Sequence, residues 1–461
     1  MAKGTSETAA ARGASSRWEA LVLEDRVHRT LYTDPEIFSE EMRKIFGGTW
    51  VFLGHESELP EAHAFKTGTL GTRPLLLTRD ANGELHAFLN RCTHRGARVC
   101  REESGSARHF RCGYHGWTFD SSGRLVAVPF PNAYGPDFDT GGLGLGELPR
   151  LECYRGLIFG TLNADAPDLL EHLGAAKPLL DRWFQQSPVG RVRVRSGAHR
   201  IVYRGNWKLA YDNAADGYHP PFSHRSLQEM TDLRYGGGRS LTHFMRDPDE
   251  GPMLQQALGN GHTFCDQRPA MGDSFWQQDR PVPGGDAYEA ALRERLGDAE
   301  AERMLEYAVG WGMNLNIFPN LLVIGNQLQV IEPIAVDRTQ LTWYATTTEG
   351  VPDEINTLRM RMQEDFPSFG EPDDLANFEE CQRGLGIPEL EWIQIGRGLV
   401  GDRQKLGPDG VTTAPITDEL QLRSYLQAWK RYMGAELELT IAGHGASAAE
   451  KRRSATAGRV G

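Results

Sequence analysis

Two short glycine-rich segments between residues 91 and 117 carry side chains that bind metals. The first reads RCTHRGARV and contains Cys92 and His94, and the second reads RCGYHGW and contains Cys112 and His115. Thiolates and imidazoles are soft or borderline ligands that select transition metals. The two segments therefore predict one metal centre with two cysteine and two histidine ligands.

Two kinds of metal centre use this ligand set. A structural zinc site usually takes two cysteines from one segment and two histidines from another. Here each segment supplies one of each, which suits a two-iron cluster whose thiolates hold one iron and whose imidazoles hold the other. Gly96, Gly113 and Gly116 allow tight loops that leave backbone N–H groups free for the bridging sulfides. The pattern favours the iron–sulfur cluster over zinc.

An iron–sulfur cluster of this kind only passes electrons on, so the chain should contain a second site that uses them. The segment NWKLAYDNAADGYHPPFSH (206–224) contains His219 and His224, with Asp216 one expected helical turn before His219. Two histidines and one carboxylate leave three positions open on Fe(II), where substrate and O₂ can meet. The two prolines after His219 are expected to end its helix and to leave His224 on an irregular turn. The alternative is two unrelated histidines at the end of a helix.

The elements that must position these residues change in type along the chain. Residues 46–162 read as short strands, with Asn-Gly and Ser-Gly hairpin turns in LLLTRDANGELHAFLN and WTFDSSGRLVAVP. The later segments are expected in this order: a helix at 167–184, a strand at 192–209, mostly β structure at 313–348 with breaks at Pro319, Gly325 and Pro333, and helices at 351–366 and 417–434. Thr417 is the expected N-cap of the last helix, and Gly434 follows its end.

Composition limits the class of protein. The chain has 461 residues and a formal net charge of −12 at pH 7, with 39% hydrophobic and 24% charged residues. This length favours two domains, and the acidic balance argues against nucleic acid or an anionic membrane as a partner. No apolar run of about 18 residues could span a membrane, and residues 1–16 lack the apolar core of a secretory signal.

Six cysteines over this length are too few for a disulfide framework, so a reducing cytoplasm is expected. The four outside the two motifs, Cys100, Cys153, Cys265 and Cys381, are expected to be buried packing thiols. No G-x-G-x-x-G motif lies between a strand and a helix, so the chain is not expected to bind NAD(P)H or flavin itself. Electrons must then come from a separate protein.

The segment from Trp50 to Trp117 resembles the Rieske domain in the large (α) subunit of aromatic-ring-hydroxylating oxygenases. The resemblance runs from TWVFLGHESELP at residue 49 to about Gly398, and it includes NRCTHRGARV, RCGYHGWTFDSSGRL and the D-x-Y-H-x4-H pattern of residues 216–224. EWIQIGRGL (391–399) is similar to a W-x4-RGL element of the ring-hydroxylating branch. This favours that branch over shorter demethylase-type relatives.

The resemblance implies an α+β fold, in which an all-β Rieske [2Fe-2S] domain precedes a catalytic domain with a helix-grip (START-like) antiparallel sheet over a long helix. The implied parts are a disordered tail at 1–16, an N-terminal helical segment at 17–44 that packs on the catalytic domain, a Rieske domain at 45–165, a catalytic mononuclear-iron domain at 166–439 and a disordered tail at 440–461.

The resemblance also implies the ligands. Cys92 and Cys112 would hold one cluster iron and His94 and His115 the other, while the mononuclear iron would take His219, His224 and a carboxylate from EPDDLANFEECQ (371–382).

Two aspartates compete for that carboxylate position. Pro372 suggests a helix start with Asp373 as its N-cap, and Asp374 then shares an inward face with Phe378 and Cys381. The family match also falls on Asp374, which we therefore choose.

Asp216 is expected to act on His219 rather than on iron. A carboxylate beside this imidazole would hold the ring and raise its basicity. In the family the matching aspartate bridges to a Rieske histidine of the neighbouring subunit, which corresponds to His115 here. That implies electron transfer between subunits and a head-to-tail trimer. The alternative is an aspartate that only caps a helix.

The function implied by the resemblance is that of a terminal oxygenase. It would use O₂, and electrons from a reductase with or without a ferredoxin, to cis-dihydroxylate an aromatic ring, with an aromatic carboxylate as the preferred class. The assembly would be a homotrimer (α3) or, with a small β subunit, α3β3. The alternatives are a Rieske monooxygenase or demethylase, and a non-catalytic iron–sulfur electron carrier.

Several residues are loose candidates for contacts with substrate. Those for the apolar pocket, each of which also suits the core, are Phe222, Met313, Asn314, Leu328 and Phe369. Arg204 or Arg225 could pair with a substrate carboxylate, although both also suit the surface.

Overall fold

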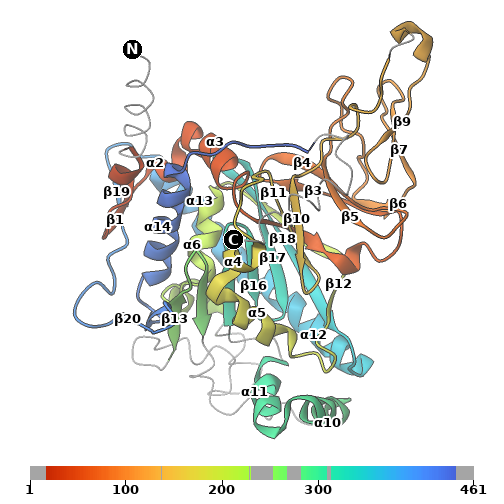
Figure 1. Cartoon of the computed structure of the whole chain (residues 1–461). Coiled ribbons are helices and arrows are strands. Elements are labelled where there is room, and N and C mark those ends of the chain that lie inside the picture. Colours follow the sequence, from red (N-terminus) through yellow and green to blue (C-terminus); the bar gives the residue numbers. More distant parts are fainter. Residues whose placement is uncertain are drawn as a thin grey trace. The chain divides into compact units, whose positions relative to one another are not determined.

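The computed structural model describes residues 17–135, 138–227, 229, 253–266, 282–308 and 313–442, so the predicted tails lie outside the described residues at 1–16 and 443–461. The chain divides into two compact units (Figure 1). The larger unit combines the described residues up to Ile45 with Pro167–Glu436. The smaller unit combines Phe46–Ala166 with the described residues from Leu437 onward.

The smaller unit is built from short antiparallel strands in three sheets, of orders β10-β11-β2, β5-β4-β3-β6 and β7-β8-β9. These strands are β2 (Val51–His55), β3 (Ala64–Leu70), β4 (Arg73–Arg79), β5 (Leu85–Leu89), β6 (Ser104–Ser106), β7 (His109–Arg111), β8 (Thr118–Asp120), β9 (Leu125–Ala127), β10 (Arg150–Tyr154) and β11 (Leu157–Thr161). The strand texture predicted for residues 46–162 is therefore correct.

Two hairpins of the smaller unit turn on the predicted glycines. Gly83 between β4 and β5 has φ +82°, and Gly123 between β8 and β9 has φ +78°, a region that favours glycine. In each turn an aspartate, Asp80 or Asp120, uses Oδ1 to accept the backbone N–H groups two and four residues later, at 2.8–3.1 Å. The two turns thus share one hydrogen-bond pattern.

The larger unit contains a nine-stranded antiparallel sheet of order β12-β18-β17-β16-β15-β14-β13-β21-β20. Its strands are β12 (Val192–Tyr203), β13 (Leu254–Ala257), β14 (Thr263–Asp266), β15 (Met313–Ile317), β16 (Leu321–Ile324), β17 (Gln327–Ala335), β18 (Arg338–Thr348), β20 (Lys405–Leu406) and β21 (Thr412–Pro415). The break predicted at Pro333 is wrong, because this proline lies inside β17, where the register shifts. A strand tolerates proline at such an irregularity.

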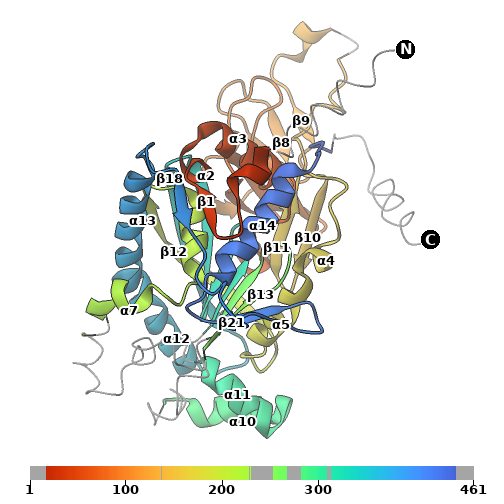
Figure 2. The same ribbon diagram turned by 90° about the vertical axis from the view of Figure 1, so that its left-hand side faces the viewer.

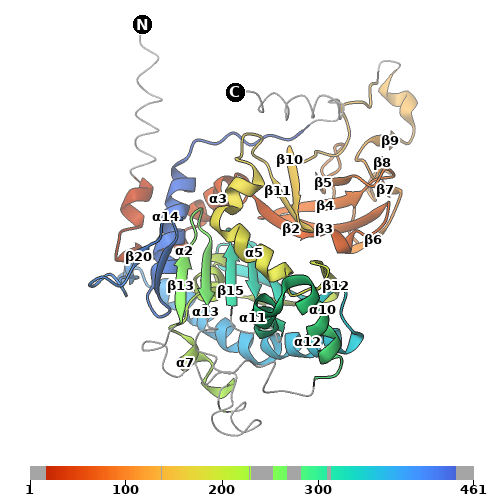
Figure 3. The same cartoon turned by 60° about the horizontal axis from the view of Figure 1, so that its bottom comes forward.

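The larger unit also contains helices. They are α2 (Thr30–Thr33), α3 (Pro35–Lys44), α4 (Leu169–Leu173), α5 (Lys177–Phe184), α6 (Trp207–Ala214), α7 (Pro220–Ser223), α10 (Gly285–Leu296), α11 (Asp298–Ala308), α12 (Asp353–Asp365), α13 (Glu371–Leu385) and α14 (Leu420–Gly434). The helix α14 packs against β13 and β14, and α12 packs against β18 (Figure 2). Two more helices, α10 and α11, pack on each other (Figure 3). A pair of short strands, β1 (Arg26–His28) and β19 (Trp392–Gln394), forms a separate sheet.

Three elements predicted in the larger unit differ from the structure. The last helix begins at Leu420 with Glu419 rather than Thr417 as its N-cap, and it still includes Gly434. The Thr417 carbonyl instead accepts a hydrogen bond from Arg397 Nε at 2.8 Å, which holds this stretch as a loop. The helix predicted at 167–184 is interrupted by a 3-10 turn, and the strand predicted at 192–209 ends at Tyr203.

Glu41 of α3 connects the N-terminal segment to two helices of the larger unit. Its fully buried carboxylate accepts hydrogen bonds from Lys208 Nζ at 2.6 Å, Trp207 Nε1 at 2.8 Å and Trp429 Nε1 at 2.7 Å. A buried charge is stable only when it is paired and hydrogen-bonded. This contact fixes α6, which leads directly into the segment with the predicted iron ligands.

The described cysteines are free thiols. Cys100 and Cys265 are buried as predicted, but Cys153 and Cys381 are exposed, so the packing prediction is wrong for these two.

Other expectations concern the C-terminal tail and the membrane. Disorder predicted from residue 440 does not hold for the first residues, because Thr440 N donates to Leu162 O at 2.8 Å and Ala442 N donates to Glu147 O at 2.9 Å. Within the described ranges, no helix has the length and apolar character needed to cross a membrane.

Candidate functional site

The two predicted cluster segments fold into matching loops. In each loop the cysteine N–H donates to the carbonyl of the residue five positions later, Ala97 or Trp117. The N–H of the glycine four positions after the cysteine donates to the cysteine carbonyl. The distances are 2.8 and 2.9 Å for Cys92 and 2.8 and 3.0 Å for Cys112. The residues that donate back, Gly96 and Gly116, have φ +79° and +73°. Residues other than glycine rarely adopt this backbone conformation, which explains why both positions are glycine.

The four predicted cluster ligands meet between these loops. Cys92 and Cys112 are buried neighbours, and the ring centroids of His94 and His115 are 4.5 Å apart. Burial and the adjacent Cys112 thiol raise the pKa of Cys92, and a bound metal would favour its thiolate. His94 Nδ1 is buried and has no hydrogen-bond partner in the described part of the chain. These donors fit a two-iron cluster with two thiolate and two imidazole ligands.

The segment of the second predicted site is arranged differently from the prediction. The helix α6 stops at Ala214, so Asp216 and His219 lie in a loop. The two prolines after His219 begin the short helix α7 instead of ending one, and His224 is its C-cap. Proline suits the start of a helix, where its missing N–H is not needed. A Cβ at Gly217 would lie 2.3 Å from Ile416 Cγ1, so this loop packs too closely for a side chain.

His219, His224 and Asp374 nevertheless converge. Asp374 Oδ1 lies 3.6 Å from His219 Nε2 and 3.3 Å from His224 Nε2. One ligand atom from each residue lies within 4.8 Å of the others. Asp374 is buried, and its Oδ1 makes no hydrogen bond to any described residue. A metal ion satisfies a buried carboxylate oxygen that faces two imidazole nitrogens, so this donor set fits mononuclear iron.

A carboxylate lies behind each imidazole. Asp216 Oδ2 is 3.0 Å from His219 Nδ1, and Asp373 Oδ2 is 3.5 Å from His224 Nδ1. Such contacts fix the ring and direct the Nε2 lone pair towards a metal. Burial lowers the pKa of His219, but the hydrogen bond to Asp216 and the charge of Asp374 outweigh it, so the net shift is upward.

The helix α13 carries both candidate aspartates. It follows a π-helical turn at Phe366–Gly370 and starts at Glu371, so Asp373 lies inside its first turn and the predicted N-cap role is wrong. Asp374 shares a buried face with Phe378, as expected, whereas Cys381 is exposed. π-Helical turns are often found at functional sites.

Three further residues near this site were not singled out from the sequence. Burial, and then the charge of Asp374, raise the pKa of Glu371, which accepts a hydrogen bond from Gln329 Nε2 at 3.1 Å. Burial raises the pKa of Asp212 to about 7, and its carboxylate accepts a hydrogen bond from Tyr32. The Arg397 guanidinium lies 4.4 Å from the ring centroid of Tyr218. Only Arg397 had a sequence signal, the W-x4-RGL element.

The loose substrate-contact candidates receive limited support. Phe222 and Phe369 are 73% and 52% exposed, which does not suit an enclosed apolar pocket. Met313 and Leu328 are buried, and Asn314 Nδ2 donates to Ala214 O at 2.7 Å. Arg204 and Arg225 are exposed, as surface residues would be.

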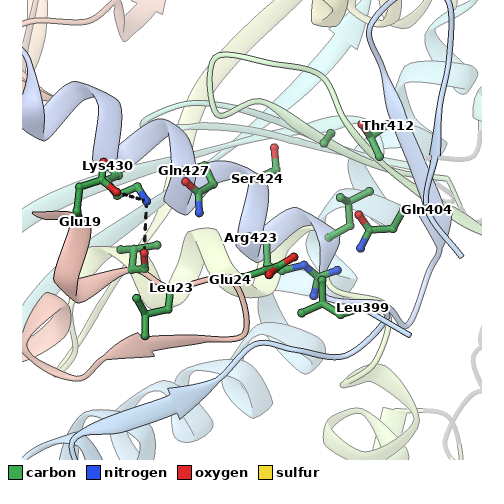
Figure 4. Close-up of a pocket in the computed structure, with 13 residues that line it drawn as sticks. Glu19, Leu23, Glu24, Leu399, Gln404, Thr412, Arg423, Ser424, Gln427 and Lys430 are labelled. Atoms are coloured by element: carbon green, nitrogen blue, oxygen red, sulfur yellow. Dashed lines mark hydrogen bonds and ion pairs between the residues drawn. The ribbon is translucent and has the colours of Figure 1, made fainter. Parts of the chain in front are cut away.

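A cavity of about 600 Å³ in the larger unit has no lining residue in common with the predicted iron ligands. It is lined by the N-terminal segment, α14 and the loop around Leu399 (Figure 4). Across it, Lys430 Nζ pairs with Glu19 Oε2 at 2.9 Å.

Comparisons with protein families match both parts of the chain. Residues 49–154 match the Rieske [2Fe-2S] domain, and residues 191–435 match the catalytic domain of the ring hydroxylating alpha subunit.

Relatives of similar length are large subunits of dioxygenases. Toluate 1,2-dioxygenase subunit alpha from Pseudomonas putida is 37% identical, over 80% of this chain and 82% of the relative. The 2-halobenzoate 1,2-dioxygenase large subunit from Burkholderia cepacia is 34% identical, over 81% and 80%. A solved structure of naphthalene 1,2-dioxygenase with indole in its active site has a TM-score of 0.76 and 27% identity, over 95% of this chain and 96% of that one.

Proposed function

This chain belongs to the ring-hydroxylating alpha subunit family, and from that premise we propose that the aromatic ring it hydroxylates carries a carboxylate. The protein is an aromatic-ring-hydroxylating dioxygenase subunit, an oxidoreductase that dihydroxylates the ring with O₂. Its cofactors are a Rieske [2Fe-2S] cluster and mononuclear iron. As the terminal oxygenase it takes its electrons from a reductase or ferredoxin.

The relatives support an acidic substrate. The toluate, 2-halobenzoate and anthranilate enzymes are 34–37% identical to this chain, and each of these names denotes a benzene ring with a carboxylate. The biphenyl and naphthalene relatives named after hydrocarbons are 31–32% identical. The relatives named after aromatic acids are thus more similar to this chain than those named after hydrocarbons, which favours an acidic substrate.

The convergence of His219 Nε2 and His224 Nε2 on the unsatisfied Oδ1 of Asp374 is the observation that carries the assignment of the oxygenase site. In the proposal these three residues hold the mononuclear iron. The cluster ligands are Cys92, His94, Cys112 and His115. When bound, the cluster supplies single electrons, and the mononuclear iron activates O₂ beside the substrate.

The other residues of the site hold these ligands in place. Asp216 accepts the Nδ1–H of His219, which fixes the tautomer and the ring orientation so that the Nε2 atom faces the metal position. Asp373 lies in the same position behind His224. Arg397 stacks on Tyr218, and the loop with Gly217 packs closely on Ile416, so the segment between Asp216 and His219 cannot move freely.

We assign the assembly by analogy to a head-to-tail trimer, with or without a small β subunit. Relatives named "subunit alpha" and "large subunit" support a multi-subunit oxygenase. In the trimer, Asp216 would link His219 to His115 of the partner subunit, so that the cluster of one chain serves the iron of the next.

Oxygen uptake with a matched reductase tests the substrate class. Benzoate, toluates and anthranilate should be turned over with a kcat/KM at least about 100-fold above that of toluene or naphthalene, because a site built for a polar group rejects a ligand that lacks it. With benzoate or a toluate as substrate, both atoms of ¹⁸O₂ should appear in a cis-diol. A preference for the hydrocarbons would contradict the acid proposal, and a product with one hydroxyl would point to a monooxygenase.

A further inference from the structure

We propose that the β4–β5 hairpin of the smaller unit carries an additional metal site, separate from both iron sites. Its ligands are Asp80, Glu84 and His86, and it takes a divalent cation of the first transition row such as zinc. One ligand atom from each of these residues lies within 4.8 Å of the other two. Imidazole and carboxylates together suit zinc and its neighbours in the series.

The separation of the ligand atoms fits a bound ion. Asp80 Oδ2 lies 3.5 Å from His86 Nε2. Two atoms that are each about 2.1 Å from a tetrahedral zinc ion are about 3.4 Å apart. The same kind of separation, 3.3 and 3.6 Å, joins Asp374 to the two histidines of the oxygenase site. Asp80 Oδ2 and His86 Nε2 are therefore spaced for coordination to one ion.

Hydrogen bonds already orient two of the three proposed ligands, Asp80 and His86. Asp80 uses Oδ1 for the backbone N–H groups of Asn82 and Glu84, while its Oδ2 lies 3.4 Å from Asn82 Nδ2 and 3.5 Å from His86 Nε2. His86 Nδ1 lies 2.8 Å from Glu147 Oε1, the carboxylate-behind-imidazole arrangement that supports metal-binding histidines. His86 Nε2 is a buried atom that makes no hydrogen bond within the described ranges beyond its 3.5 Å contact with Asp80 Oδ2.

The β8–β9 hairpin has the same turn as the β4–β5 hairpin, but it also has an arginine that pairs with the turn aspartate. At Asp120 the same turn places Arg124 four residues later, and this guanidinium pairs with Asp120 Oδ2 at 2.8 Å. At Asp80 the corresponding residue is Glu84, a second carboxylate. Together with Glu147, three carboxylates then lie around one imidazole, and a single protonated His86 would offset only one of their charges. A metal ion supplies the missing charge.

An ion has a route to the site. The three ligands and Glu147 line a cavity of about 790 Å³, which leaves room for water to complete the coordination. The other cations that line it are Arg108 and Arg124, and Arg124 is occupied by Asp120. Glu84 is an exposed lining residue of this cavity, so its side chain can turn onto an entering ion.

A simpler arrangement would be a protonated His86 between Asp80 and Glu147, with no metal. That arrangement accounts for two of the carboxylates but gives Glu84 no part. It also predicts that substitution of Glu84 changes no binding property, whereas the metal proposal predicts weaker metal binding. The two accounts are therefore separable by experiment.

Zinc binding to the holoenzyme is the test. Protein treated with a mild chelator, with its iron content and cluster spectrum intact, is dialysed against micromolar zinc and analysed for metals. The expected result is one zinc per chain with no loss of iron. No zinc above background, or zinc gained only as iron is lost, overturns the proposal.

Matched variants locate the zinc. His86→Gln should abolish binding, and Glu147→Gln, which removes the carboxylate behind His86, should weaken it about 10–100-fold. Glu84→Gln changes an exposed residue, so it should fold normally and still bind zinc at least about 10-fold more weakly. The control is His109→Gln, another histidine that lines the same cavity, which should bind like the wild type. Unchanged binding in both His86→Gln and Glu84→Gln would also overturn the proposal.

Discussion

Asp373 and Asp374 are adjacent in sequence but face different atoms of the proposed iron site. Asp374 Oδ1 faces the Nε2 atoms of both histidines, so Asp374→Ala should remove a ligand and empty the mononuclear site. The Rieske spectrum should stay unchanged, because none of the proposed cluster ligands is touched. Iron content per chain, together with the visible and EPR spectra of the cluster, measures both effects.

Asp373→Ala should have a smaller and different effect. Its Oδ2 lies 3.5 Å from His224 Nδ1, so its loss should loosen the imidazole and lower iron affinity about 10–100-fold. The sequence pattern had predicted an N-cap, whose loss would cost only about 1 kcal/mol of stability. Iron titration of the two alanine variants compares their iron affinities. A greater loss of affinity in Asp373→Ala than in Asp374→Ala would mean that Asp373 is the ligand.

The cluster ligands can be tested against a cysteine from the same core. Cys92→Ala or His115→Ala should abolish the Rieske absorption and EPR signals, because each removes a proposed ligand. Cys100 packs in the same hydrophobic cluster of buried residues, and Cys100→Ala should keep the signals. If both ligand variants showed normal spectra, the assignment would be wrong.

At the scale of residues, the sequence could predict ligand types but not every neighbour. The Cys/His spacing and the two histidines after Asp216 are local patterns, and their side chains do meet. The roles of Asp373 and Glu371 depend on which face of α13 turns towards the sheet, and a π-helical turn before that helix changes its start. Local propensity does not contain that information.

At the scale of elements, strands and long helices were predictable, whereas the short connections were not. Proline after His219 was expected to stop a helix, but α6 had already ended and the prolines start α7. Proline is compatible with both positions, so the choice comes from packing, such as the contact of Gly217 with Ile416. The hairpins at Gly83 and Gly123 were predictable because their turns are determined by adjacent residues.

The buried contact between α3 and α6 should be essential for stability. Glu41→Ala leaves the ammonium of Lys208 buried and uncompensated, which should lower the free energy of unfolding by about 3–5 kcal/mol. The double variant Glu41→Leu with Lys208→Met removes both charges and should lose much less. Urea denaturation of the three proteins measures this, and equal losses in single and double variants would contradict the argument.

Two buried histidines should make the larger unit sensitive to acid. His262 Nδ1 accepts the Phe318 N–H at 2.9 Å and its Nε2 lies 2.7 Å from the His172 carbonyl, so the ring must be neutral. Burial lowers the pKa of His172 to about 4 and that of His262 to about 3. Between these values and about 6.5, the unfolded chain binds protons that the folded chain does not.

The contribution of this pair is therefore full above about pH 6.5 and is lost as the pH falls. At pH 5 each histidine should lower the free energy of unfolding by on the order of 2 kcal/mol. His262→Gln has no proton to gain, so the difference in unfolding free energy between pH 7 and pH 5 should be smaller than in the wild type. An identical difference in both proteins would exclude this pair as the source.

At the scale of the whole molecule, the sequence implied a Rieske part and a catalytic part, and the family comparisons match both. Assembly is harder to predict, because a subunit contact appears in one chain only as surface residues. Asp216 is relevant both to the site within one chain and to the assembly. Within the chain it holds His219. In the proposed trimer it also reaches His115 of the partner subunit.

Asp216→Asn should separate these two roles. The amide keeps a hydrogen-bonding group beside His219 but loses the charge, so both metal centres should assemble and the cluster should still be reduced rapidly. Turnover should fall at least about 10–100-fold, because the support of His219 is weakened. A residue that only caps a helix would leave turnover close to normal.

Mixed trimers test whether electrons cross between chains. Asp216→Asn chains keep an intact cluster, and His94→Ala chains keep an intact oxygenase site, while each should be nearly inactive alone. In a head-to-tail trimer the cluster of an Asp216→Asn chain can serve the iron of a His94→Ala neighbour, so co-refolded or co-expressed mixtures should regain turnover. Electron transfer confined to one chain allows no such rescue. Each His94→Ala chain then lacks a working cluster, and each Asp216→Asn chain lacks the aspartate that connects its cluster to its iron. Inactive mixtures whose mixed composition is verified by native mass spectrometry would reject the inter-subunit route.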